Sequence, residues 1–94
     1  MKRYVTHVRV LQELGGDQEL LEHLCDLGVV VRRDEGYLPQ EVERILVAYT
    51  LARELGVNWE GVDVALKLRE ELVATRQQVV LLIEELRARA RARR

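Results

Sequence analysis

The last third of the chain carries a heptad repeat, and this repeat limits the possible folds more than any other feature of the sequence. One core position of the repeat holds Ala65, Leu72, Val79 and Leu86, and the other holds Leu68, Thr75, Leu82 and Arg89. Such spacing is typical of a helix that pairs with a second helix along an apolar seam. A single helix cannot bury that seam alone, so the sequence predicts a homodimer through residues 65–86 with an isologous interface.

The expected dimer interface is wider than a simple two-stranded seam. Residues 79–83 are all apolar, so this part of the helix has apolar side chains around most of its circumference. We therefore expect it to pack against the partner helix and against a further surface. The expected interface residues are Ala65, Leu68, Leu72, Val79, Leu82, Ile83 and Leu86.

Length and composition favour a small helical binding protein over an enzyme. The chain has 94 residues, of which 48% are hydrophobic and 33% are charged, with one proline, one cysteine and no serine. A chain of this length forms one domain with a modest core, which leaves little room for an enclosed active site. Neither histidine lies three or four residues from Cys25, and no catalytic or metal-ligand spacing is present. We expect no enzymatic activity, no metal and no cofactor.

Cysteine usage and hydropathy predict a soluble cytoplasmic protein. One cysteine cannot form an internal disulfide, which suits a reducing compartment. No apolar run approaches the roughly 20 residues that span a bilayer, and the start of the chain lacks the apolar core of a signal peptide. No membrane association is therefore expected.

The net charge of −1 conceals an uneven distribution of charge. Five arginines and no acid lie among residues 87–94, which leaves residues 1–86 with ten bases and sixteen acids, a net charge of −6. The basic end suits the negative end of a helix dipole, and nucleic acid and an acidic partner are further candidates for it. A solubilising helix end is the simpler interpretation. An acidic body is the opposite of what DNA binding needs, because phosphate neutralisation supplies much of the affinity.

The first quarter of the chain predicts a helix-turn-helix. Val8, Leu11 and Leu14 are spaced as on one face of a helix, and leucines repeat at helical spacing again within residues 17–28. Two short helices joined by a turn that contains glycine form this motif. The expected N-caps and stops are Thr6 and Gly15 for the first helix, and Asp17 and Gly28 for the second.

A small hairpin wing is expected after the second helix. Residues 29–31 are three valines, which favour a strand. Residues 32–38 then supply a tight turn and a return strand, which complete a β-hairpin. The sequence therefore predicts a β-hairpin wing beside the helix pair.

A third helix and a fourth helix are expected after the wing. Pro39 suits the first turn of the third helix, whose apolar period continues to Gly56. Asn58 is a candidate N-cap for the fourth helix, and Gly61 is an internal weak point. We expect a head over residues 1–58 and a C-terminal helical stalk over residues 59–94.

The segment from residue 51 to residue 68 carries a family resemblance. A leucine-rich helix leads into Asn58-Trp59, then Gly61, then Val64-Ala65-Leu66-Lys67-Leu68. This order closely resembles the corresponding segment of CbpM-type chaperone-modulatory proteins, and length and element order match over nearly the whole chain. The resemblance implies a mainly α fold: a MerR-like winged helix-turn-helix head with a small β-hairpin wing, and a long C-terminal dimerisation helix. It also implies a non-enzymatic modulator that binds the J-domain of a DnaJ-like co-chaperone and limits its use by a DnaK-type chaperone.

The alternative function is a MerR-like DNA-binding transcriptional regulator. DNA-binding members present an Arg and a Tyr from the second helix, and the matching positions here are Glu22 and Leu24. Residues 13–26 contain five acids and no base, so nearly every charge facing the phosphates would have the wrong sign. Arg32 and Arg33 form a basic pair, for which a solvated hairpin is a simpler interpretation than a phosphate clamp. DNA is the less favoured partner.

Two surfaces are candidates for the contact with a J-domain. J-domains as a class carry a basic second helix, to which an acidic surface is complementary. The acidic second helix of this chain offers Glu19, Glu22, His23 and Asp26. The third helix and the segment after it offer Arg44, Arg53 and Trp59. A solvated helix face and a core position for the tryptophan are the simpler alternatives, and the sequence leaves the choice of surface open.

Overall fold

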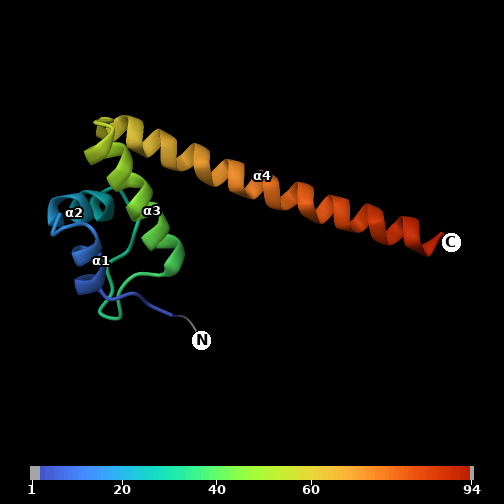
Figure 1. Cartoon of the computed structure of the whole chain (residues 1–94), viewed down its shortest axis with the longest axis horizontal. Coiled ribbons are helices and arrows are strands. Elements are labelled where there is room, and N and C mark those ends of the chain that lie inside the picture. The colour runs from blue at the N-terminus through green and yellow to red at the C-terminus, as the bar shows by residue number, and fades with distance from the viewer. Residues whose placement is uncertain (1–2, 94) are drawn as a thin grey trace. The chain divides into compact units, whose positions relative to one another are not determined.

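The structure of the protein, a computed structural model, describes residues 3–93 and is mainly helical (Figure 1). Its elements are α1 (His7–Glu13), α2 (Gln18–Asp26), α3 (Pro39–Tyr49), the π-helical turn η1 (Thr50–Glu54) and α4 (Trp59–Ala92). The chain forms two compact units, Met1–Val62 and Asp63–Arg94. The mainly α fold and the long C-terminal helix expected from the sequence are confirmed.

Short polar side chains define the starts of α1 and α2. The Thr6 hydroxyl accepts a hydrogen bond from the backbone N–H of Arg9, and the Asp17 carboxylate accepts one from the N–H of Leu20, both at 3.2 Å. These bonds satisfy N–H groups that the first turn of a helix leaves without a partner. Both predicted N-caps are therefore confirmed. α2 ends before Gly28, whose φ of 75° turns the chain away from the helix axis.

The buried face of α1 differs from the expected one. Val10 and Leu14, four residues apart, are buried, whereas Val8 is 64% exposed. Residues four apart stay on one side of a helix with 3.6 residues per turn, but repeated steps of three drift around it. The stripe expected to include Val8 is therefore wrong at that residue.

The first unit has one core, to which α1, α2 and α3 all contribute (Figure 1). The loop between α2 and α3 adds Tyr37, the largest fully buried side chain. The buried apolar residues of this unit are Val10, Leu14, Leu20, Leu21, Leu24, Val30, Tyr37, Ile45, Ala48 and Val62. This core fixes the orientation of α2, the helix with most of the predicted contact residues.

The expected β-hairpin wing is wrong. The described residues contain no strand, and the isolated bridge at Tyr37 joins it to Val5, not to residues 29–31. The Val5 N–H donates to the Tyr37 carbonyl, and the Tyr37 N–H donates to the Val5 carbonyl, both at 2.8 Å. Gly36 permits this close approach, because a Cβ at that position would overlap the Val5 carbonyl oxygen. The segment before α1 thus occupies the backbone groups that the return strand would need.

A buried carboxylate holds the loop between α2 and α3. Glu41, in the first turn of α3, is 4% exposed and accepts hydrogen bonds from the N–H groups of Val31 and Leu38, both at 2.9 Å. Arg33 Nη1 donates to the same carboxylate at 2.7 Å. The Val31 N–H is a group that a strand over residues 29–31 would need for pairing. This arrangement is the second physical reason why the hairpin does not form.

The connection from α3 to α4 is less regular than the sequence predicts. α3 begins at Pro39, as expected, but its continuation is the π-helical η1. The Asn58 side-chain oxygen accepts a hydrogen bond from the Gly61 N–H at 2.8 Å, which confirms the predicted N-cap of α4. A Cβ at Gly61 would lie 2.7 Å from Val57 Cγ1. A larger residue at this position would therefore require the Val57 side chain to shift.

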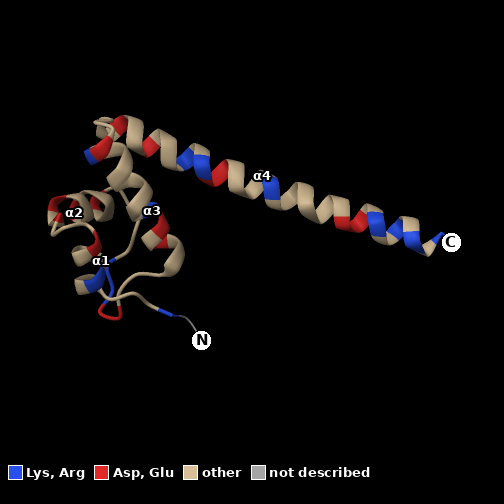
Figure 2. Ribbon diagram, viewed as in Figure 1, with Lys and Arg blue, Asp and Glu red and all other residues tan. Residues whose placement is uncertain are grey.

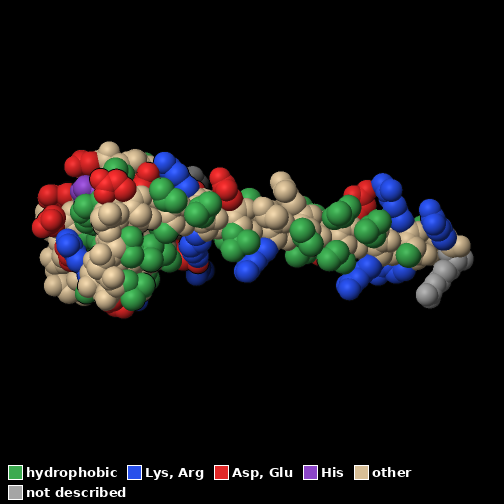
Figure 3. Space-filling model, turned by 90° about the horizontal axis from the view of Figure 1, so that it is seen from above, with side chains coloured by type: hydrophobic (Ala, Val, Ile, Leu, Met, Phe, Trp, Pro, Cys, Tyr) green, Lys and Arg blue, Asp and Glu red, His purple; other side chains and the backbone are tan. Residues whose placement is uncertain are grey.

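In the second unit, α4 continues to Ala92. Ion pairs one turn apart join Lys67 to Asp63 at 3.0 Å and Arg89 to Glu85 at 2.6 Å, along a helix that ends in arginines (Figure 2). Apolar side chains are visible along the helix surface (Figure 3). Six of the seven expected dimer-interface residues are 43–59% exposed: Leu68, Leu72, Val79, Leu82, Ile83 and Leu86. Ala65 is half-buried, and the homodimer stays a prediction.

Hydropathy along the helices agrees with the expected lack of a membrane span. Within residues 3–93, no helix combines the length and the apolar character that crossing a bilayer requires.

Candidate functional site

The predicted contact residues of α2 share one exposed face of the helix. Glu19 and His23, one turn apart, lie toward one side of this face, and Glu22 and Asp26, one turn apart, lie toward the other side. The helix has no lysine or arginine, so its exposed charge is acidic (Figure 2). Its core side is formed by Leu20, Leu21 and Leu24.

On the first side, α2 is joined to η1 and to the first turn of α4. The Arg53 guanidinium donates two hydrogen bonds to the Asp17 carboxylate, from Nε at 2.7 Å and from Nη2 at 3.2 Å. Arg53 also lies 3.9 Å from the Glu19 carboxylate and 5.7 Å from the ring centroid of Trp59. The His23 ring stacks on Trp59 with a centroid distance of 3.9 Å. We call these five residues the Arg53 cluster.

The Arg53 cluster unites most of the two surfaces that the sequence kept separate. Arg53 and Trp59, from the segment after α3, meet Asp17 and His23 at α2, so they belong to one continuous surface. The hydrogen bond from Arg53 is the main cause of a pKa of Asp17 below its ordinary value. The Arg44 guanidinium donates a hydrogen bond to the carbonyl oxygen of Val29 at 3.5 Å.

Trp59 has an intermediate position. It is half-buried, packed on His23, and still presents part of its ring at the surface. Its role as a partner contact stays a prediction. The ring anchors the start of α4 to α2 and remains accessible to a partner.

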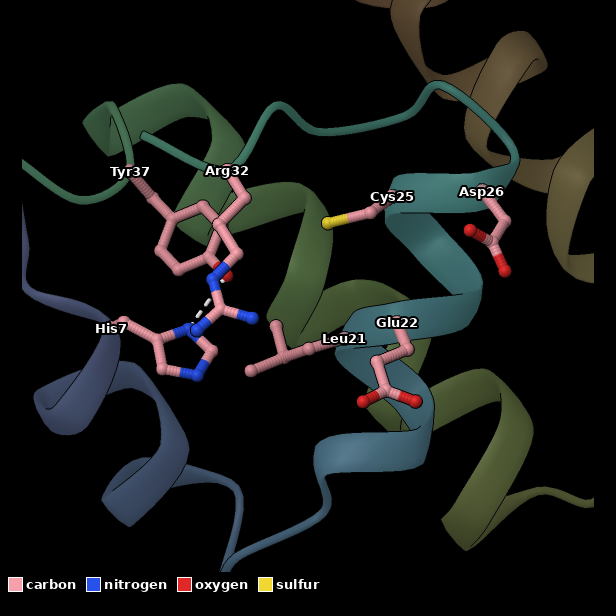
Figure 4. Close-up of a pocket in the computed structure, with 7 residues that line it drawn as sticks. All are labelled: His7, Leu21, Glu22, Cys25, Asp26, Arg32 and Tyr37. Atoms are coloured by element: carbon pink, nitrogen blue, oxygen red, sulfur yellow. Dashed lines mark hydrogen bonds between the residues drawn. The ribbon is translucent and has the colours of Figure 1, made fainter. Parts of the chain in front are cut away.

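On the second side, α2 borders a hollow of about 130 Å³ (Figure 4). The α2 residues form one wall, and the residues of α1 and of the loop before α3 lie opposite them. The lining residues are His7, Leu21, Glu22, Cys25, Asp26, Arg32 and Tyr37. His7 Nδ1 and the Tyr37 hydroxyl are hydrogen-bonded at 2.9 Å, which links α1 to the loop. We call this space the α2 hollow.

Burial sets the protonation states in the α2 hollow. Burial lowers the pKa of His7, and the positive charge of Arg32 lowers it further, so His7 is neutral at neutral pH. Burial also raises the pKa of the Cys25 thiol and of the Tyr37 hydroxyl. Cys25 is therefore a protonated thiol and a weak nucleophile. Among the described residues, no three His, Cys, Asp or Glu side chains are grouped to hold a metal ion.

The basic pair Arg32 and Arg33 is divided between two places. Arg33 is bound to Glu41 at 2.7 Å and stabilises the loop, whereas Arg32 lines the α2 hollow. Burial alone would raise the pKa of Glu41, but the bonds from Arg33 and from two backbone N–H groups lower it overall. A phosphate clamp requires two guanidinium groups that bind the same phosphate. Arg33 is already bound to the Glu41 carboxylate, so the pair does not form such a clamp in this structure.

Sequence reasoning missed four residues of these two sites. Asp17 was assigned only as an N-cap, and the roles of His7, Arg32 and Tyr37 beside α2 were not foreseen. The contacts that place them join positions 30 and 36 residues apart, so no local spacing reveals them. The available signal was Tyr37, because a large aromatic residue in a loop usually needs a packing partner and a partner for its hydroxyl.

Comparison of the chain with protein-family models, with curated proteins and with solved structures finds no match. The resemblance to CbpM-type proteins therefore stays a prediction from residues 51–68 and from the order of the helices. The geometry of α2 and its two sides is the basis on which a function can be argued.

Proposed function

We propose that the chain is a non-enzymatic modulator that binds the J-domain of a DnaJ-like co-chaperone and regulates its interaction with a DnaK-type chaperone. The observation that carries this proposal is the acidic surface of α2, a helix that contains no lysine or arginine. Glu22 accepts a hydrogen bond from the Gln18 side chain at 3.2 Å, but neither Glu22 nor Asp26 forms an ion pair with any described residue. Glu19 has only the 3.9 Å contact with Arg53. A basic helix of a partner is the complement of such a surface.

The contacts that hold α2 in place make its acidic surface suitable for binding a partner. The bidentate bond between Arg53 and Asp17 and the stacking of His23 on Trp59 fix the helix at its first turns. A surface that is ordered before binding loses less conformational entropy when a partner arrives. The negative charge of these carboxylates also attracts a basic partner at long range and raises the rate of association.

The fold interpretation that goes with this function is a MerR-like helix-turn-helix without a hairpin wing. α1 and α2 are the helix pair, and the loop that would have formed the wing is tied to Val5 and Glu41. In a DNA-binding relative of this type, the second helix faces phosphates. The carboxylates of α2 and the commitment of Arg33 to Glu41 argue against that role here.

A homodimer through α4 is the second part of the proposal. Val79, Val80, Leu81, Leu82 and Ile83 are each at least 43% exposed in the single chain. Such a row of apolar side chains on a helix surface is stabilised by pairing with another helix. A second copy of the chain, joined through residues 65–86, supplies that helix.

Charge reversal on α2 tests the proposed function. We expect the variant Glu19→Lys/Glu22→Lys to lose the capture of a J-domain protein that the unmodified chain shows in a pull-down. The matched control Asp34→Lys/Glu35→Lys makes the same change of charge on an exposed turn, and it should retain capture. Equal capture by both variants would eliminate α2 as the contact surface. Salt-sensitive retention of the unmodified chain on duplex DNA would instead support the transcriptional regulator.

A further inference from the structure

The size of the α2 hollow limits what can occupy it. Sites for small molecules and cofactors usually have volumes of about 300–1,000 Å³. The α2 hollow, at about 130 Å³, is well below that range. Since one water molecule takes about 30 Å³ in the liquid, the hollow has room for roughly four waters. That volume suits one long side chain of a partner protein better than a free metabolite.

The lining matches a side chain with an apolar stem and a charged end. Leu21 and Tyr37 are fully buried core residues whose surfaces form the apolar inner part, next to the neutral thiol of Cys25 (Figure 4). Glu22 and Asp26 are exposed residues of α2 at the rim. Lysine and arginine bury their methylene stems on apolar surface and keep the charged end near water or a carboxylate.

The charges around the α2 hollow favour a cation. The two rim carboxylates carry two negative charges, Arg32 carries one positive charge, and His7 and Cys25 are neutral at neutral pH. The net charge is therefore negative, and neither carboxylate is within ion-pair distance of Arg32. In the Arg53 cluster, by contrast, Arg53 already neutralises Asp17.

We propose that the α2 hollow receives the side chain of one lysine or arginine from the basic helix of the partner J-domain. This inference rests on the proposed function and gives it a specific contact. It selects the side of α2 with Glu22 and Asp26 as the binding side. The Arg53 cluster then orders the helix from the neighbouring side of the same face and makes no essential contact.

Neutral variants of equal size test the role of the rim charges. We expect Glu22→Gln/Asp26→Asn to bind the J-domain about tenfold more weakly in calorimetry, because two surface charge contacts are lost. The matched control Asp34→Asn/Glu35→Gln removes two charges from an exposed turn outside the α2 hollow and should bind as the unmodified chain does. Arg32→Gln should bind as well or more tightly, since a positive charge is removed from beside the cation. Weaker binding of Arg32→Gln, with no effect of the rim variant, would indicate an acidic occupant and overturn the proposal.

Cys25 gives a second, independent readout, because it is the only cysteine of the chain and lines the α2 hollow. Saturation with the J-domain should slow the reaction of Cys25 with iodoacetamide in proportion to the fraction of chain bound. If the J-domain binds while Cys25 reacts at its free rate and the rim variant binds normally, the hollow is not the contact and the modulator function stands. If the unmodified chain does not bind the J-domain at all, both the hollow proposal and the proposed function are wrong.

Discussion

The replacement of Glu41 by alanine tests how the loop beside α2 is held. In the structure the carboxylate receives hydrogen bonds from the N–H groups of Val31 and Leu38 and from the Arg33 guanidinium, and Glu41 is 4% exposed. Alanine removes the acceptor for all three donors at once. The loop that carries Arg32 and Tyr37 would then lose its attachment to α3.

The expected loss of stability can be estimated from these bonds. A hydrogen bond to a charged group contributes about 1.5–3 kcal/mol to the free energy of unfolding. Val31 is an exposed residue and water can reach it after the substitution, so we take the lower end of the range for each of the two backbone bonds. Glu41→Ala should therefore lower the free energy of unfolding by about 3 kcal/mol. That loss is large against the total of about 5–15 kcal/mol for a small domain.

Urea unfolding followed by the fluorescence of Trp59 measures this loss. Trp59 is the only tryptophan and stacks on His23, so its emission reports on the first unit. Glu41→Gln keeps one acceptor oxygen and should lose about half as much stability, roughly 1–2 kcal/mol. Gln40→Ala, at an exposed position of the same helical turn, is the matched control. A Glu41→Ala variant as stable as this control would refute the role of the carboxylate.

Three further perturbations have definite expected outcomes. Gly36→Ala should unfold the first unit or destabilise it far more than Gly16→Ala. A Cβ at Gly36 overlaps the Val5 carbonyl oxygen, whereas a Cβ at Gly16 meets no atom within 4 Å. Equal thermal midpoints of the two variants would contradict this reasoning. The pKa of Glu41 is lowered in the folded chain, so its contribution to stability is complete above the ordinary value of 4.5 and is lost as the pH falls through the folded value. The free energy of unfolding should therefore decrease below about pH 4.5, and it should decrease less in Glu41→Gln. Leu82→Asp should convert a dimer to a monomer in sedimentation experiments, and a monomeric unmodified chain would contradict the dimer.

The helix ends were predictable from the sequence because their causes are local. The N-caps Thr6, Asp17 and Asn58 each bind an N–H three residues ahead, and the first turn of α3 contains Pro39 as expected. The order of the helices followed from these signals and from the apolar period.

The hairpin was not predictable from local signals because its competitors are distant. The three valines favour a strand, but the Val31 N–H is taken by Glu41, ten residues ahead, and Tyr37 is paired with Val5. A propensity for extended structure leaves open which acceptor the backbone finds. Here a side-chain carboxylate and the N-terminal segment supply the acceptors.

The sequence predicted which residues make the candidate site acidic, but not how those residues are placed relative to the rest of the fold. The acidic character of α2 follows directly from its residues. Its union with Arg53 and Trp59, and the hollow beside Glu22, depend on contacts between segments that only the folded core brings together.

The most direct test of the account is a calorimetric titration of the isolated J-domain of a DnaJ-like co-chaperone into the unmodified chain. We predict saturable binding whose affinity falls as the salt concentration rises, because complementary charges on α2 and on the basic helix of the J-domain supply part of the free energy. No heat of binding and no complex at low salt, with a correctly folded chain, would contradict the central claim that α2 is a J-domain-binding surface.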